Sequence, residues 1–234
     1  MVEFSEERSD LHLPETGLIA AFRLRGECLL RNRALPSPAV LTGLTDHVRQ
    51  HRHSRDNAML IVHFTPLGAS AFTRESLDAL WNRSEDLGAV LDCSTHVAEI
   101  ADRLAETTDH ARRIQIVERF LTARMNEAEP DPLVRAAVDW IERAPPSARV
   151  SDLVRHIGLS QSALERRFRR QVGTAPRRFI SLLRFGRAAQ LFRKGASLTT
   201  AAHAAGYYDQ AHFNHDFSRL TGLAPSAFFA QERS

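Results

Sequence analysis

Residues 157–168 read IGLSQSALERRF, and residues 205–217 read AGYYDQAHFNHDF. From the capping positions Ser160 and Asp209 onward, the two stretches keep a constant offset of 49 positions, which extends to Pro176 and Pro225. Each stretch has a glycine that can end one helix, a side chain that can cap the next, and apolar residues at the spacing of one buried helix face. The sequence therefore predicts two helix-turn-helix units, which suit two successive major grooves of DNA.

The residues around the two units predict an all-helical region. Pro176 stands in the first turn of the longest predicted helix, where proline is favoured, and Lys194-Gly195 supplies a basic last turn and a glycine stop. Helices are expected at 132–143, 150–157, 161–171, 176–193, 198–205, 210–220 and 225–230. Together they predict an all-α C-terminal domain over residues 131–234 that contains both units.

Charge is unevenly distributed along the chain. The formal net charge is only +3, but residues 133–234 hold 16 Lys and Arg against 7 Asp and Glu, a balance of +9. Residues 1–132 have a balance of −6. A basic half beside an acidic half predicts that only the C-terminal half meets a polyanion, although a solvated basic face has the same signature.

Composition restricts the class of protein. The chain has 234 residues, enough for two modest domains, and no apolar run approaches the length of about 20 residues that a membrane span needs. The acidic N-terminus lacks the apolar segment of a secretory signal. The two cysteines, Cys28 and Cys93, make neither a disulfide framework nor a zinc site, so a reducing cytoplasm is the expected compartment.

The N-terminal half, residues 1–127, predicts a sensor or dimerisation domain with a small antiparallel sheet or partial barrel followed by two helices. Residues 17–24 and 58–64 have strand composition, and residues 46–53 are expected to pair with 58–64 as a hairpin around the turn at 54–57. Helices are expected at 95–107 and 110–126, and the two prolines within 127–132 mark the domain boundary. The whole chain is thus predicted to be α+β.

The N-terminal half could also serve as a protein-binding module that forms a dimer through its two helices. Four apolar side chains on these helices are candidates for the interface, although packing in the core explains them equally well: Leu104, Ile114, Val117 and Leu121.

The outer face of helix 161–171 carries side chains suited to reading bases. Arg166 can donate two hydrogen bonds to a guanine edge, and Gln161 can pair with adenine. Glu165 can accept a hydrogen bond from a cytosine amine or orient Arg166, and Ser162 shares this face. Three further arginines are expected to contact phosphates, with a solvated helix surface as the alternative: Arg167, Arg169 and Arg170.

The outer face of helix 210–220 is less basic. Gln210 and Asn214 suit adenine edges, and Ala211 and His215 also point outward. A contact to a phosphate is expected from His212. Packing is the expected role of Tyr207, and for Tyr208 the two interpretations are a phosphate contact and packing, of which packing is favoured. Asp216 is expected to pair with a neighbouring arginine or to stay clear of DNA.

The span 133–229 resembles the C-terminal DNA-binding domain of AraC/XylS-type transcription regulators. The resemblance is strongest at residues 204–213 and 221–228. It implies two subdomains joined by helix 176–193, with both recognition helices on one face of the DNA. By position in the motif it implies base contacts by Gln161, Ser162, Glu165, Arg166, Gln210, Ala211, Asn214 and His215. This chain departs from the family at His215, where arginine is frequent, and near Ser218, where a basic residue is frequent.

Residues 63–72 resemble the Phe-x-Pro-Gly-Gly stretch of a sensor-like domain that precedes such regulators. The resemblance implies small-molecule sensing, dimerisation, or both. The expected partners are therefore double-stranded DNA, a small-molecule effector, a second copy of the chain and, for an activator, RNA polymerase. The expected protein is a cytoplasmic, bacterial, sequence-specific transcription regulator without a cofactor.

A metal-dependent sensor or an enzyme in front of the DNA-binding domain is the alternative. His47, His51 and His53 share one face of their predicted strand, as the ligands of a cupin metal site do, but the hairpin register puts His63 on the opposite side. The only nearby carboxylates are Asp46 and Asp56, so a polar surface or a pocket rim is favoured over a metal site. No catalytic motif is present to favour an enzyme, and the cysteines suit buried positions better than a thiol sensor.

Overall fold

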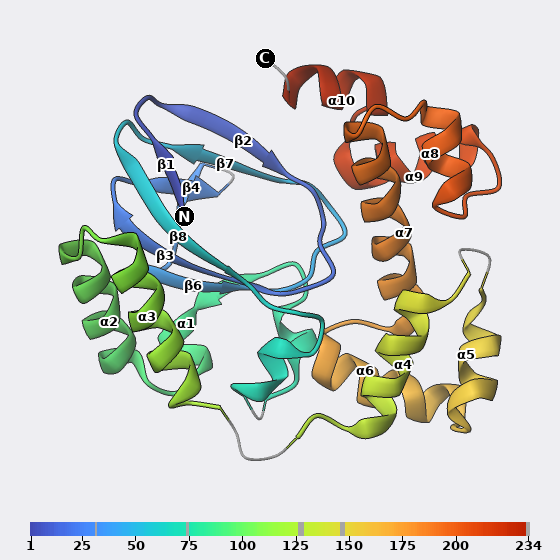
Figure 1. Cartoon of the computed structure of the whole chain (residues 1–234), viewed down its shortest axis with the longest axis horizontal. Coiled ribbons are helices and arrows are strands. Elements are labelled where there is room, and N and C mark those ends of the chain that lie inside the picture. The colour runs from blue at the N-terminus through green and yellow to red at the C-terminus, as the bar shows by residue number, and fades with distance from the viewer. Residues whose placement is uncertain (31, 74, 126–128, 146–147, 233–234) are drawn as a thin grey trace.

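The computed structural model describes the whole chain except residues 31, 74, 126–128, 146–147, 233 and 234. Figure 1 shows a sheet-containing N-terminal part, with helices α2 and α3 along one side, beside an all-helical C-terminal part. The predicted α+β class is confirmed. No helix in the described ranges combines the length and the apolar character that crossing a membrane requires.

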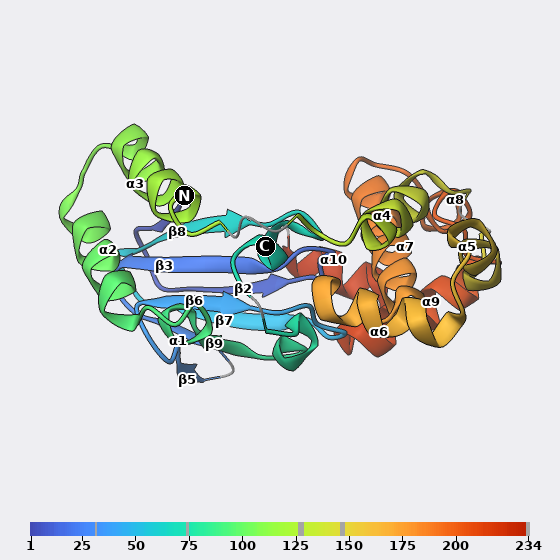
Figure 2. The same ribbon diagram turned by 90° about the horizontal axis from the view of Figure 1, so that it is seen from below.

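Two antiparallel sheets form the N-terminal part (Figure 2). The first sheet has the order β1 (Val2–Phe4), β8 (Asn57–His63), β3 (Ile19–Arg25), β6 (Ala39–Thr42), β9 (Ser84–Asp86). The second has the order β2 (Arg8–His12), β7 (Arg49–His53), β4 (Cys28–Leu30), β5 (Arg33–Ala34). Residues of both sheets line one cavity, so the sheets face each other as the predicted partial barrel requires.

The predicted hairpin between residues 46–53 and 58–64 is wrong. Strand β7 pairs with β2 and β4, and strand β8 pairs with β1 and β3. His51 therefore lies opposite Asp10, not residue 60. At the turn between the strands, Asp56 has a φ of 54°, and the buried Asn57 begins the strand that enters the other sheet. The prediction failed because β2, whose mostly polar residues give little strand signal, takes the place beside β7.

Three short helical turns connect the sheets to two amphipathic helices. The turns are η1 (Gly68–Ala71), η2 (Leu77–Leu80) and α1 (Leu87–Val90), and the amphipathic helices are α2 (Ser94–Glu106) and α3 (His110–Thr122). Helix α3 ends four residues before the predicted end. Of the apolar residues considered for dimerisation, Leu104 and Val117 are core residues, whereas the side of α3 that carries Ile114 faces solvent.

The C-terminal helices begin and end within a residue or two of their predicted limits. They are α4 (Pro132–Arg143), α5 (Val150–Ile157), α6 (Gln161–Val172), α7 (Pro176–Arg193), α8 (Leu198–Ala204), α9 (Gln210–Thr221) and α10 (Pro225–Glu232). The predicted caps explain this agreement: Ser160 Oγ accepts from the Ala163 N–H, and Asp209 accepts from the His212 N–H. Gly158 ends α5 with a φ of 73°, which glycine adopts without strain.

The two helix-turn-helix units have different cores. The core of α4–α6 is continuous with that of the sheets, and the side chain of Arg178 lies over the Trp81 ring. The second unit has its own aromatic core, which joins α7 to α8–α10. A backbone hydrogen bond from Val48 N–H to Leu220 C=O and packing by Leu11, Leu13 and Val48 join it to the N-terminal half. The boundary expected at 127–132 lies partly outside the described residues.

Cys28 and Cys93 differ in accessibility. Cys28 is buried and lines the cavity between the sheets, and burial raises its pKa to about 11. Cys93 is half-buried, and burial raises its pKa as well. We expect iodoacetamide at pH 8 to alkylate Cys93 well before Cys28 in the folded protein, because Cys28 combines a scarce thiolate with blocked access. Peptide mass spectrometry over time measures both rates, and guanidinium should equalise them. Equal rates without guanidinium would contradict this burial.

Candidate nucleic-acid interface

Helix α6 is anchored by three fully buried side chains, Leu164, Phe168 and Val172. Its opposite face is open to solvent and carries most of the predicted contact residues. The exposed ones are Gln161, Ser162, Arg166, Arg167, Arg169 and Arg170, and Glu165 is half-buried. The helical spacing of the apolar residues thus buries one face of α6 and leaves a polar, basic face exposed, as a recognition helix requires.

Glu165 holds two of its neighbours in place. Gln161 Nε2 donates to Glu165 Oε1 at 3.0 Å, and Arg169 Nη2 lies 3.4 Å from Glu165 Oε2. The alternative in which Glu165 orients Arg166 is therefore not what the structure has. Within the described residues Arg166 makes no hydrogen bond or ion pair, so its guanidinium can meet a partner without first losing one.

Arg167 points to a different neighbour. It forms an ion pair of 2.8 Å with Asp131, the residue whose other oxygen caps α4 by accepting from the Leu133 N–H. Gln171 accepts from the backbone N–H of the same aspartate. This contact joins α6 to α4, and a phosphate contact by Arg167 has to compete with it.

An acidic segment of the N-terminal half borders the outer face of α6. Glu75, Ser76 and Asp78 line the same surface hollow as Arg166 and Arg169. The end of helix α6 also packs on this segment. At Gly173, directly after the helix, an added Cβ would lie 3.2 Å from the Leu77 carbonyl oxygen. The sequence did not predict this neighbour, since nothing local links residues 75–78 to residues 162–170.

The second unit places its predicted contact residues on α9 with mixed exposure. Ala211, His212 and His215 are exposed, and Gln210 accepts a hydrogen bond of 2.6 Å from Thr199 Oγ1 of α8. Asn214 is half-buried, and its Oδ1 has no hydrogen-bond partner in the described part of the chain. On this face the Asn214 side-chain oxygen is therefore an acceptor without a partner in the described chain, and the Gln210 amide is held in place by Thr199.

The two tyrosines before α9 have opposite environments. Tyr207 is buried and packs against Phe213, as predicted. Burial raises the pKa of Tyr207, and Asp216, which accepts a hydrogen bond from its hydroxyl, raises it further. Asp216 also pairs with Arg219 at 2.9 Å, which confirms the arginine partner expected for it. Tyr208 is 86% exposed, so the packing role favoured for Tyr208 is wrong.

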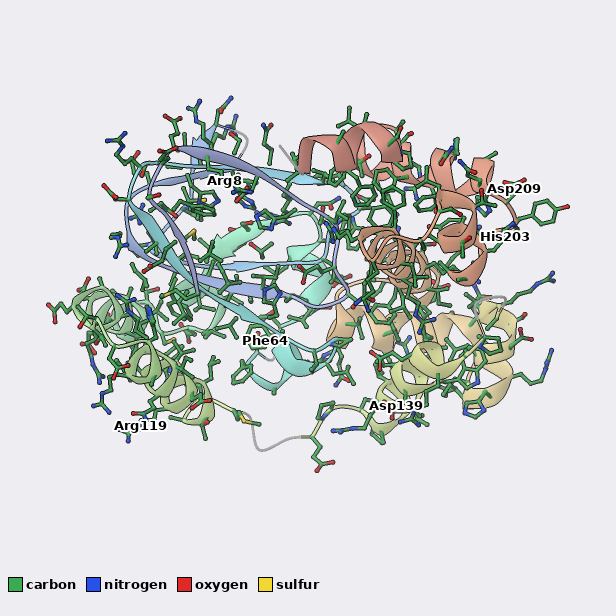
Figure 3. The ribbon with its side chains drawn as sticks, turned by 45° about the horizontal axis from the view of Figure 1, so that its top comes forward. Arg8, Phe64, Arg119, Asp139, His203 and Asp209 are labelled. Carbon is green, nitrogen blue, oxygen red and sulfur yellow. The ribbon has the colours of Figure 1, made fainter. Side chains whose placement is uncertain are left out.

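Helix α7 separates the two units. It has 18 residues, which corresponds to about 27 Å at 1.5 Å per residue, comparable with one turn of DNA of about 34 Å. Helix α6 lies near the start of α7, and α8 and α9 lie near its end (Figure 1). In Figure 3, His203 and Asp209 of the second unit are well separated from Asp139 of the first.

The N-terminal half contains a cavity of about 290 Å³ between its sheets. Most of its lining is apolar, and four histidines add polar groups: His12, His51, His53 and His63. His63 thus faces the same cavity as His51 and His53, contrary to the predicted hairpin register. His47 is not part of the lining, and it contacts Thr45 instead. Burial lowers the pKa of His51 to about 3 and also lowers the pKa of His53.

The carboxylates near these histidines were not predicted from the sequence. Asp10 and Glu15 both line the cavity, and Glu15 lies 3.0 Å from His63 Nδ1. Residues 8–12 read RSDLH, with Leu11 as the one apolar residue, and this pattern was too weak to identify a strand.

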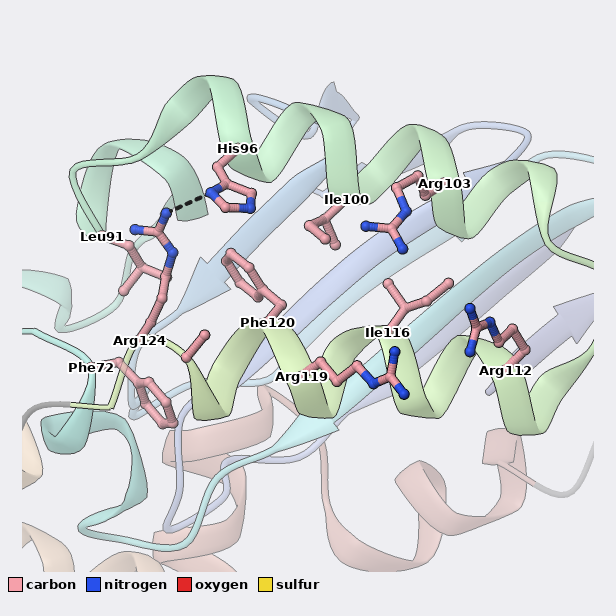
Figure 4. Close-up of a pocket in the computed structure, with 11 residues that line it drawn as sticks. Phe72, Leu91, His96, Ile100, Arg103, Arg112, Ile116, Arg119, Phe120 and Arg124 are labelled. Atoms are coloured by element: carbon pink, nitrogen blue, oxygen red, sulfur yellow. Dashed lines mark hydrogen bonds between the residues drawn. The ribbon is translucent and has the colours of Figure 1, made fainter.

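A second hollow lies between α2 and α3 (Figure 4). Its floor is apolar, with Ile100, Ile116 and Phe120, and one wall has Arg124 Nη2 2.9 Å from His96 Nδ1. Three more arginines line it, with no carboxylate among the described lining residues: Arg103, Arg112 and Arg119. The hollow is basic, although the N-terminal half as a whole is acidic.

Comparisons with known proteins agree with this arrangement. Residues 153–231 match the family described as a helix-turn-helix domain. Over 100 residues the chain is 33% identical to a Streptomyces lividans protein described as an AraC-like transcription regulator, a match that spans 42% of this chain. The chain covers only 33% of the length of that relative.

Similarity to solved structures extends beyond the helical half. ToxT from Vibrio cholerae, at 1.65 Å resolution, matches with a TM-score of 0.53 and 12% identity over 95% of this chain and 97% of ToxT. A ToxT structure with bound unsaturated fatty acid matches with a TM-score of 0.52 and 11% identity over 97% of this chain and 92% of ToxT. At such identities the likeness concerns the fold, which the two chains share along nearly their whole lengths.

Proposed function

We propose that residues 153–231, which match a helix-turn-helix family, form an AraC-type DNA-binding domain, and that the protein is a sequence-specific DNA-binding transcription regulator. Helices α6 and α9 enter adjacent major-groove segments on one face of the duplex. The observation that carries this proposal is the pair of capped helix-turn-helix units at the two ends of α7. The regulator works in the bacterial cytoplasm, where its DNA is.

The roles of individual side chains follow from exposure and chemistry. In the first unit Arg166 reads a guanine edge, and the remaining base contacts come from Gln161, Ser162 and Glu165. In the second unit the base contacts come from Gln210, Ala211, Asn214 and His215. Contacts to phosphates come from Arg169, Arg170, His212 and Tyr208, and from Arg167 where its pair with Asp131 opens.

Selection from a randomised duplex pool tests the proposal. The full-length protein is incubated with the pool at low salt, bound duplexes are amplified, and fluorescence anisotropy is then measured on the enriched site. We expect a site with two sequence elements, one for each unit, and a steep fall of affinity with salt. Sequence-blind binding after repeated rounds would contradict a reading function for α6 and α9.

Replacing Arg169 with alanine should weaken binding to all duplexes alike. A phosphate contact carries no sequence information, so we expect the slope of log K against log salt to decrease in magnitude by about 1, with little change in specificity. Anisotropy titrations at several salt concentrations measure the slope. Arg155, an exposed arginine of α5 paired with Asp152, gives a charge-matched control as Arg155→Ala. A changed base preference in Arg169→Ala would contradict the phosphate role.

We propose in addition that the cavity between the sheets takes a small-molecule effector. Its volume of about 290 Å³ and its apolar lining with a few polar groups suit a compact, largely apolar molecule with one polar head. ToxT, which shares the fold, has been crystallised with an unsaturated fatty acid. The acidic segment at 75–78, which borders α6, gives the N-terminal half a direct contact with the first unit. A dimer through the N-terminal half and, for an activator, contact with RNA polymerase complete the proposed partners.

The effector proposal is tested with a panel of apolar carboxylic acids of increasing chain length. A ligand that binds the cavity should shift the thermal unfolding midpoint and change the affinity for the selected DNA site by about 5–150-fold. Met59→Trp, which fills the cavity from β8, should abolish both effects. Retention of both effects by Met59→Trp would show that the ligand binds elsewhere.

A further inference from the structure

Three groups that bind metals come together where β2 runs beside β7. One ligand atom each from Asp10, His12 and His53 lies within 4.8 Å of the other two. Asp10 Oδ2 lies 3.9 Å from Nε2 of the buried His53. Asp10 and His12 are adjacent positions on the same face of β2, and His53 is the partner of Arg8 in β7, so the sheet register itself creates the cluster.

The hydrogen bonds behind His53 fix its tautomer. Asn57 is fully buried, and its Nδ2 donates to the carbonyl oxygens of Arg25 and Glu27 at 3.3 and 3.0 Å. The other amide atom, Asn57 Oδ1, is therefore an acceptor, and it lies 3.1 Å from His53 Nδ1. His53 Nδ1 must carry the hydrogen, which leaves a bare lone pair on Nε2. A ring nitrogen held in this way by a hydrogen bond behind it is the usual arrangement of a metal-binding histidine.

The bare nitrogen faces the cluster without a donor. His53 is only 5% exposed, and its Nε2 is buried and has no hydrogen-bond partner among the described residues. Asp10 Oδ1 is engaged by Arg8 at 2.6 Å, so Oδ2 is the oxygen that faces His53. Two acceptors therefore face each other across 3.9 Å, and a buried polar atom without a partner is costly. A cation between them satisfies both.

We propose that Asp10, His12 and His53 bind one divalent transition-metal ion, with Zn²⁺ as the best match. Two imidazoles and one carboxylate are ligands that Zn²⁺ accepts in four-coordinate sites, with a fourth position left open. Bonds of about 2.0–2.2 Å put tetrahedral ligand atoms about 3.4 Å apart, so the cluster has to contract by roughly 1 Å. His12 is exposed at the rim, and rotation of its side chain can supply most of that movement.

The open coordination position gives the site a role in ligand binding. Asp10, His12 and His53 all line the cavity between the sheets, so the fourth position is available to a carboxylate or hydroxyl of a molecule bound there. This consequence rests on the proposed effector site. Binding of the metal does not, because it can be measured without effector and without DNA.

The test is titration of the full-length protein, stripped with EDTA, with ZnCl₂ in a calorimeter, together with absorption spectra after addition of Co²⁺. We expect one equivalent of Zn²⁺ per chain and visible Co²⁺ bands of a four-coordinate site. His12→Gln and Asp10→Asn lie at the rim and should leave the fold intact, as circular dichroism checks. Each should weaken Zn²⁺ binding at least about tenfold. His47→Gln, a histidine outside the cluster, should bind as the parent does.

Two results would overturn the proposal. One is the absence of a saturable Zn²⁺ or Co²⁺ site in the parent protein, which would mean that a proton alone separates Asp10 from His53. The other is Zn²⁺ binding that His12→Gln and Asp10→Asn leave unchanged, which would put the ion elsewhere on the chain. Loss of sequence-specific DNA binding in a separate assay would affect neither result, so the regulator proposal and the metal proposal fail independently.

Discussion

Replacing Phe217 with alanine is expected to lower the free energy of unfolding of the second unit by about 3–5 kcal/mol. Phe217 is fully buried in α9, and its ring centroid lies 5.2 Å from that of Phe185 on α7. It lies 5.5 Å from the rings of Phe213, Phe228 and Phe229. The truncation removes the side chain that joins α7, α9 and α10, and it leaves a cavity that rigid aromatic neighbours cannot easily fill.

Urea denaturation followed by far-ultraviolet circular dichroism measures this loss. Tyr208→Ala provides the control, because Tyr208 is also aromatic and lies in the same unit but is 86% exposed. Its removal should change the free energy of unfolding by no more than about 0.5 kcal/mol. A loss below about 1 kcal/mol in Phe217→Ala would contradict a tightly packed aromatic core in this unit.

Replacing Arg166 with alanine should cost about 1–3 kcal/mol of binding free energy on the selected site, a loss of roughly 5–150-fold in affinity. The side chain is exposed on α6, opposite the buried Leu164 and Phe168. It has no partner in the described structure to lose, so the loss reflects contacts with DNA alone. The preference at one base position should relax, whereas binding to non-specific duplex should fall much less.

Arg119→Ala is the matched control for Arg166→Ala. It removes the same charge from an exposed position on α3, and Arg119 lies well away from the helix-turn-helix units (Figure 3). We expect its DNA affinity to equal that of the parent protein. If Arg166→Ala keeps both its affinity and its base preference, the first reading helix has been assigned to the wrong face.

The helices were predictable because their signals are local. Ser160 and Asp209 cap α6 and α9, glycines end α5, α6 and α9, and an apolar stripe at helical spacing marks each buried face. All of this information lies within a few residues of each helix end. The strand pairing was not predictable in the same way. Whether β7 pairs with β8 or with β2 depends on contacts between segments about 40 residues apart, and β2 is largely polar.

In the candidate sites too, local features could be predicted and contacts between distant segments could not. The exposed face of α6 followed from helix periodicity, but the partners of its charged residues did not. Arg167 pairs with Asp131, from an element 36 residues away, and Glu165 holds Arg169 instead of Arg166. The histidines of β7 were identified from their alternation, yet their carboxylate neighbour Asp10 was missed, because it arrives through the unpredicted strand β2.

The central claim is that α6 and α9 of one chain read two elements on the same face of the duplex. Insertion of base pairs between the two elements of the selected site tests it most directly. An insertion of about five base pairs rotates one element by half a turn away from the other, and one of about ten base pairs restores the face but adds a full turn of distance. Because α7 fixes the separation of the units at about one turn, we predict that both insertions reduce affinity to that of a single element. Unchanged affinity with five inserted base pairs would contradict the account, because the two units would not be reading the duplex together.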